Sequence, residues 1–139
     1  MNYSVNLLLT KADCDAVLAL LAKDSGAITQ RKTSAEFTLT QFDATGPEVA
    51  GSLTAVTGQL AGIATYINSL PAGSDARRKV ELEKERLDVQ QRLLSGRQEN
   101  WGGVARIERE NSLARLTAEL AEIATCQAQV VAHKDSLSA

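Results

Sequence analysis

The sequence predicts an all-α protein, an antiparallel, coiled-coil-like helical bundle of about four helices with two long outer helices. The main observation is a run of large apolar residues whose spacing alternates between four and three, as at heptad a and d positions. This run comprises Val49, Leu53, Val56, Leu60, Ile63, Ile67 and Leu70. So narrow a stripe has to pack against a facing helix. The chain of 139 residues is 44% hydrophobic but only 4% aromatic, which predicts one domain with an aliphatic core.

Residues 1–10 are predicted to form an extended N-terminal arm, ahead of a single bundle domain over residues 11–139. The large apolar residues that alternate with polar or smaller ones in this arm are Tyr3, Val5, Leu7 and Leu9. A single strand leaves its backbone groups unpaired, so the arm pairs with a partner, lies on the bundle or stays loose. Thr10 then has the position of an N-cap, with Asp13 three residues later as in a capping box.

The first helix is predicted over about 11–42. Its stripe, which includes two polar residues, comprises Cys14, Leu18, Leu21, Ser25, Ile28, Lys32, Ala35, Leu39 and Phe42. An alternative is that Gly26 ends this helix early and that residues 36–42 (EFTLTQF) form a strand. We expect one long helix, because a glycine inside a helix costs only about 1 kcal/mol and the stripe stays in register across it.

Residues 43–47 (DATGP) predict a turn, with Pro47 at the first position of a second helix over about 47–70. A proline is tolerated there because the first N–H groups of a helix have no partner within the helix. The Pro-Ala-Gly sequence that follows is expected to end the helix. Gly58 and Gly62 form a G-x-x-x-G pair, which predicts that another helix backbone packs closely against them.

Two further helices are predicted over about 75–95 and 104–137. Ser74 is placed to cap the first of them, which is dense in opposite charges spaced three and four residues apart. Its apolar residues at sevenfold spacing are Val80, Leu87 and Leu94, with Leu82, Val89 and Leu93 on an adjoining line. The glycine-rich stretch 95–103 predicts a turn around Trp101. The stripe of the last helix comprises Leu113, Leu116, Leu120, Ile123, Gln127 and Val130.

Trp101-Gly102-Gly103 is similar to the Trp-x-Gly motif of the WXG family of secreted proteins, in which the motif lies in the turn of a helical hairpin. The resemblance covers these three residues, and the predicted helices on either side flank them as in such a hairpin. The family's C-terminal Tyr-x-x-x-Asp/Glu export signal is not present, since the tyrosines of this chain are Tyr3 and Tyr66. The resemblance implies a secreted or chaperone-type helical hairpin protein as one alternative function.

Charge and hydropathy predict neither nucleic-acid binding nor a membrane span. The formal net charge is only −2, so no strong field attracts nucleic acid or anionic lipid. The uncharged stretch 49–74 is long enough to cross a bilayer, but its polar residues lie mostly off the apolar stripe, as in a buried amphipathic helix.

The first ten residues lack a signal-peptide pattern, which predicts a cytoplasmic protein. Cys14 and Cys126 are expected to be reduced, and the alternative is one bridge between the first and last helices.

No catalytic, cofactor or metal site is predicted, so we expect a protein that is not an enzyme. Helical di-metal sites use Glu-x-x-His motifs, and Val130 stands where the glutamate would precede His133, the only histidine. His133 is expected on the surface near the helix C-terminus, where a positive charge is favourable. The sequence contains neither a Walker A motif nor G-x-G-x-x-G.

The predicted helix lengths point to assembly. The first and last helices would be about 50 Å long and the middle two about 35 Å, so the long pair would project past the short pair. We expect another subunit, either a second copy or another helical protein, to bury the projecting stripe. The expected interface residues are Leu113, Leu116, Leu120, Ile123, Val130, Leu39 and Phe42. The alternative is a monomeric bundle that binds a small apolar ligand between its helices.

Overall fold

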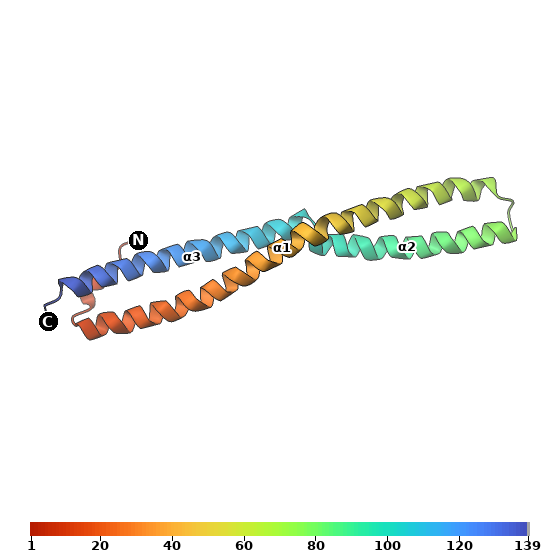
Figure 1. The fold of residues 1–139 in the computed structure, drawn as a ribbon. Helices are drawn as coiled ribbons and strands as arrows, with labels where there is room; N and C mark the ends of the chain where they lie inside the picture. Colours follow the sequence, from red (N-terminus) through yellow and green to blue (C-terminus); the bar gives the residue numbers. More distant parts are fainter. Residues whose placement is uncertain (139) are drawn as a thin grey trace. The chain divides into compact units, whose positions relative to one another are not determined.

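The computed structural model describes residues 1–138, which are helical apart from short connections. The elements are a 3-10 turn η1 (Val5–Leu7) and the helices α1 (Lys11–Ser69), α2 (Asp75–Trp101) and α3 (Gly103–Ser136). The all-α prediction is confirmed. The prediction of about four helices is not, because the helices expected over 11–42 and 47–70 are one helix of 59 residues (Figure 1).

α1 continues through Gly46 and Pro47, where the sequence predicts a turn. A proline inside a helix removes one backbone hydrogen bond and presses on the carbonyl four residues earlier, here that of Asp43, at a cost of about 3 kcal/mol. The preceding residue is a glycine, so no Cβ meets the proline ring. The apolar stripe also keeps its register, because Phe42 and Val49 are seven residues apart and both are buried. Burial of the continuous stripe therefore outweighs the local helix-breaking signal.

Contacts divide the chain into two compact units. The first contains Met1–Thr38 together with the residues from Arg109 onward, and the second contains Leu39–Glu108. In the first unit α3 lies along the first half of α1, and in the second unit α2 lies along its second half (Figure 1). α2 and α3, with 27 and 34 residues, together match the 59 residues of α1 in length. The predicted overhang of long helices past short ones is therefore absent, because each half of α1 has its own partner helix.

The core of each unit is one seam between two helices. In the second unit the seam is centred on Val56, Leu87 and Leu94, against which Leu53, Leu60 and Ile63 are partly buried. In the first unit the buried seam residues are Cys14, Ile28 and Val130. All of these residues belong to the heptad stripes that the sequence shows, so the stripes define which faces are covered.

The loop between α1 and α2 has the predicted capping geometry. Gly73 has a positive φ of 76°, a conformation that favours glycine. The Ser74 hydroxyl accepts a hydrogen bond of 3.2 Å from the backbone N–H of Arg77. The guanidinium of Arg77 in turn donates to the carbonyl of Leu70 at 3.3 Å. The Pro71 and Ser74 signals for a helix end and a helix start are thus confirmed.

The break between α2 and α3 is narrower than the predicted turn over 95–103, because α2 continues to Trp101 and α3 begins at Gly103. At Gly102 a Cβ atom would lie 2.5 Å from the carbonyl oxygen of Gln98, so this position requires glycine. α2 packs on the second half of α1, whereas α3 from Arg109 onward belongs with its first half. Trp101 is therefore the last residue of α2, next to a one-residue break at Gly102.

The N-terminal arm lies on α3, one of the three arrangements expected for it, but it includes the η1 turn and is not fully extended. The N–H of Tyr3 donates to Oε1 of Gln129 at 2.9 Å, and the Gln129 amide donates to the carbonyl of Met1 at 2.9 Å. His133 Nε2 lies 2.9 Å from the carbonyl oxygen of Leu8. His133 is therefore partly buried beneath the arm, not on an open surface as predicted.

Three further predictions for α1 have clear outcomes. The capping box is confirmed, since the N–H of Asp13 donates to the Thr10 hydroxyl and the N–H of Thr10 donates to the Asp13 carboxylate, both at 3.1 Å. Gly26 lies inside α1, so the alternative of an early helix end and a strand is wrong. The close packing expected at Gly58 and Gly62 is also wrong, because a Cβ at either position would have nothing within 4 Å.

Candidate interaction surface

The face of α2 that meets α1 follows the heptad spacing of four and three. Its residues are Arg77, Val80, Lys84, Leu87, Gln91, Leu94, Gln98 and Trp101. All but Gln98 are buried or partly buried, and Leu87 is only 3% exposed. Lys84 is paired with Asp88 at 3.2 Å, and Gln91 donates to Thr57 of α1 at 3.2 Å, so these polar seam residues have partners. The seam uses this one face of α2.

A second apolar line, which we call the outer line, consists of Leu82, Val89 and Leu93. The sequence predicted that it adjoins the first line, but it lies on the opposite face of α2. These side chains are 65%, 53% and 66% exposed, respectively. Each follows a seam residue by two positions, a rotation of about 200° around the helix, so each points away from α1. Apolar side chains gathered on the solvent face of a coiled coil are typical of a contact with another helix. The sequence shows both lines, but only the structure shows which one α1 covers.

The predicted interface residues lie mostly in the intramolecular seam. Leu113, Leu116, Leu120 and Ile123 are partly buried on α3, and Leu39 is partly buried on α1. Phe42 and Val130 are more completely covered, with exposed fractions of 5% and 1%. Phe42 and Val130 therefore already pack within the chain. The interface proposed below lies on α2 and includes none of these seven residues.

An aromatic contact holds the α2–α3 break against α1, and no sequence pattern indicates this pairing. The rings of Phe42 and Trp101 have centroids 4.9 Å apart with a tilt of 55°. Beside them, a Cβ at Gly46 would lie 3.1 Å from the carbonyl oxygen of Trp101, so the glycine permits this close approach. Arg106 forms an ion pair with Asp43 at 2.5 Å. The Gly-Pro and Trp-Gly-Gly sequences thus meet in one structural junction of the second unit.

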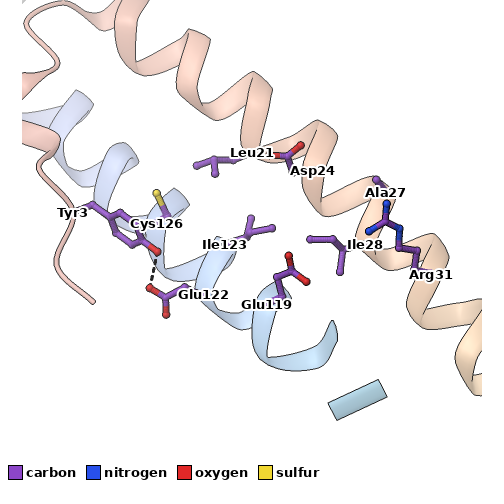
Figure 2. Close-up of a pocket in the computed structure, with 10 residues that line it drawn as sticks. All are labelled: Tyr3, Leu21, Asp24, Ala27, Ile28, Arg31, Glu119, Glu122, Ile123 and Cys126. Carbon is purple, nitrogen blue, oxygen red and sulfur yellow. Dashed lines mark hydrogen bonds between the residues drawn. The ribbon is translucent and has the colours of Figure 1, made fainter. Parts of the chain in front are cut away.

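A pocket of 410 Å³ lies between α1 and α3 under the N-terminal arm (Figure 2). Its lining residues are Tyr3, Leu21, Asp24, Ala27, Ile28, Arg31, Glu119, Glu122, Ile123 and Cys126. The Tyr3 hydroxyl donates to the Glu122 carboxylate at 2.6 Å, as Figure 2 shows. This hydrogen bond, with burial and the carboxylate charge, raises the pKa of the Tyr3 phenol from 10.0 to about 12. The hydrogen bond attaches the N-terminal arm to α3. The charged residues that line the pocket are Asp24, Arg31, Glu119 and Glu122.

A shallower groove lies between α1 and α2 near Gly62. It has a volume of 370 Å³ and is lined by Gln59, Gly62, Ile63, Tyr66, Glu83, Arg86 and Leu87. Glu83 and Arg86 form an ion pair across its edge at 2.5 Å, which lowers the pKa of the Glu83 carboxyl. Both cavities therefore mix charged and apolar lining, unlike the mainly apolar pockets that hold small apolar ligands.

Cys14 is buried and Cys126 partly buried, and both are free thiols, so the alternative of a bridge between them is wrong. Over residues 1–138, no three His, Cys, Asp or Glu side chains are grouped closely enough to hold a metal ion. None of the helices in this range combines the length and apolar character that crossing a bilayer requires.

Comparison with known proteins adds no family assignment. The chain matches no protein-family model, and no significant match was found among curated proteins or solved structures.

Proposed function

We propose that this protein is a non-enzymatic structural or adaptor module that acts by helix–helix assembly, with a second copy of the chain as its partner. The observation that carries the proposal is the outer line of α2, where Leu82, Val89 and Leu93 are each more than half exposed. They share one face of a helix whose opposite face already packs on α1. A second helix against this face would remove apolar surface from water, at roughly 25 cal/mol per Å².

The two alternative functions receive less support. An apolar ligand would meet charged groups in the pocket beneath Tyr3, among them Asp24, Arg31 and Glu119. A WXG-type hairpin would place its tryptophan in the turn, whereas Trp101 here is the last residue of α2 and its ring packs on Phe42 of α1.

The experiment that tests the proposal is light scattering after size exclusion over a wide range of protein concentration. We expect a dimer or larger species that dissociates on dilution. We also expect Leu82→Ser to weaken association more than Leu20→Ser, because the two leucines are similarly exposed but only Leu82 lies on the outer line. A monomer at every concentration would contradict the proposal.

A further inference from the structure

Four charged residues form a column beside the outer line of α2. Arg78, Glu85, Arg92 and Glu99 recur every seven residues, and all four are exposed. Residues at sevenfold spacing occupy the same heptad position, so their side chains lie along one edge of the helix. Along this edge the charge alternates in sign from each residue to the next.

Three members of this column have no partner within the chain. Across residues 1–138, the side chains of Glu85, Arg92 and Glu99 make no hydrogen bond or ion pair. Arg78 has only a long contact of 3.9 Å with Asp75, and both side chains are largely exposed. Other charges of α2, among them Lys84 and Glu83, are paired along the helix. Lys79 and Arg97 also make no side-chain hydrogen bond or ion pair across residues 1–138, but they do not share the heptad position of the column. The column is therefore a regular sevenfold pattern of charges, three of which are unpaired within the chain.

We infer that two copies of this chain pair antiparallel through the outer faces of their α2 helices, about a two-fold axis near residues 88 and 89. This inference rests on the proposed function and identifies its interface. In an antiparallel pair of identical helices, the sequence number rises along one helix as it falls along the other. The sequence numbers of any two facing residues therefore add to nearly the same total. Arg78 then lies opposite Glu99 of the second copy, and Glu85 lies opposite Arg92 of the second copy. The two-fold axis repeats each contact, so four attractive pairs form.

The same alignment also matches the apolar residues. Leu82 lies opposite Leu93 of the second copy, and Val89 meets the aliphatic stem of Arg86 of the second copy, whose charged end extends to solvent. The contact extends over residues 78–99, a length of about 33 Å along the helix. The outer line thus forms the centre of the interface and the charged column forms its edge.

A parallel pair does not satisfy the same charges. In a parallel, in-register pair, a flanking residue on one side of the apolar line faces the residue five positions later on the partner helix. Arg92 would then lie beside Arg97 of the second copy, and Glu85 would face the uncharged Gln90. Only Arg78 would face an opposite charge, Glu83, and that carboxylate already pairs with Arg86. Like charges at this spacing repel, so the charge pattern selects the antiparallel arrangement.

The test reverses charges in the column of the full chain and measures the dimer Kd by sedimentation equilibrium. Arg92→Glu turns two attractive contacts into repulsive ones, and we expect Kd to rise about 10–100-fold. The double variant Glu85→Arg with Arg92→Glu exchanges the two charges and should return Kd to near the wild-type value. Arg115→Glu, which makes the same charge change on an exposed residue of α3, is the control and should leave Kd within about twofold.

The outcomes separate this inference from the proposed function. A wild-type protein that is monomeric at every concentration contradicts the proposed function itself. A wild-type dimer whose Kd responds equally to Arg92→Glu and Arg115→Glu retains assembly but overturns the α2 interface. A dimer that Arg92→Glu weakens and the double variant does not restore overturns the antiparallel alignment. Circular dichroism of each variant, at wild-type helicity, shows that the change in Kd does not arise from unfolding.

Discussion

Alanine substitutions at Leu82 and Leu87 of α2 test which face of this helix packs in the core. Leu87 is 3% exposed and lies against Val56 and Leu94, whereas Leu82 is 65% exposed on the outer line. Leu87→Ala removes three buried carbon atoms, worth about 0.8 kcal/mol each, so we expect the free energy of unfolding to fall by about 2–3 kcal/mol. Leu82→Ala removes the same atoms from a position already in water, and we expect a change within about 0.5 kcal/mol.

The assay is urea unfolding followed by the fluorescence of Trp101, the only tryptophan, which lies in the same unit as both leucines. The protein is kept at the lowest measurable concentration, because a dimer would otherwise add stability that depends on concentration. The reasoning would be refuted if Leu82→Ala cost as much stability as Leu87→Ala, since the outer line would then be part of the core.

Two further predictions concern the helix break and the N-terminal arm. Gly102→Ala places a Cβ 2.5 Å from the carbonyl oxygen of Gln98, so we expect the free energy of unfolding in urea to fall by about 1–3 kcal/mol. Gly103→Ala is the control, because a Cβ there has nothing within 4 Å and a smaller change is expected. Equal changes for the two variants would contradict the close contact at Gly102. The Tyr3 phenol should titrate near pH 12 by ultraviolet absorbance in a variant without the other tyrosine, and near 10 once Glu122→Gln removes the carboxylate. Because folding raises this pKa, the contact stabilises the arm fully below pH 10 and the contribution is lost as pH rises from 10 to 12. An unchanged titration in Glu122→Gln would show that the hydrogen bond is not the cause.

The Gly46-Pro47 sequence explains why the helix count was wrong. Its local chemistry favours a turn followed by a helix start, and that reading is sound for an isolated segment. The heptad register instead indicates one continuous helix, because Phe42 and Val49 are seven residues apart and Gly46 occupies the stripe position between them. Burial of this stripe outweighs the local effect of the proline, so α1 is one continuous helix.

The candidate surface could be predicted only in part. The apolar line of Leu82, Val89 and Leu93 is visible in the sequence, but spacing alone cannot show whether it faces α1 or solvent. The unequal helix lengths predicted an exposed stripe on α3, but α2 and α3 pack on different halves of α1, so that stripe is partly buried. The junction between Phe42 and Trp101 had no sequence signal, because the two rings belong to segments whose pairing depends on the whole chain.

The sequence by itself determined the helical class, the faces that avoid water and the helix ends at Thr10, Pro71 and Ser74. These features depend on local spacing and capping, which act over a few residues and need no knowledge of the partner. Only the tertiary structure decided that α1 is continuous, which helix covers each of its halves, and which apolar line remains exposed. A heptad stripe requires a facing helix but does not specify which one, so these choices depend on the length match and side-chain contacts of the complete chain.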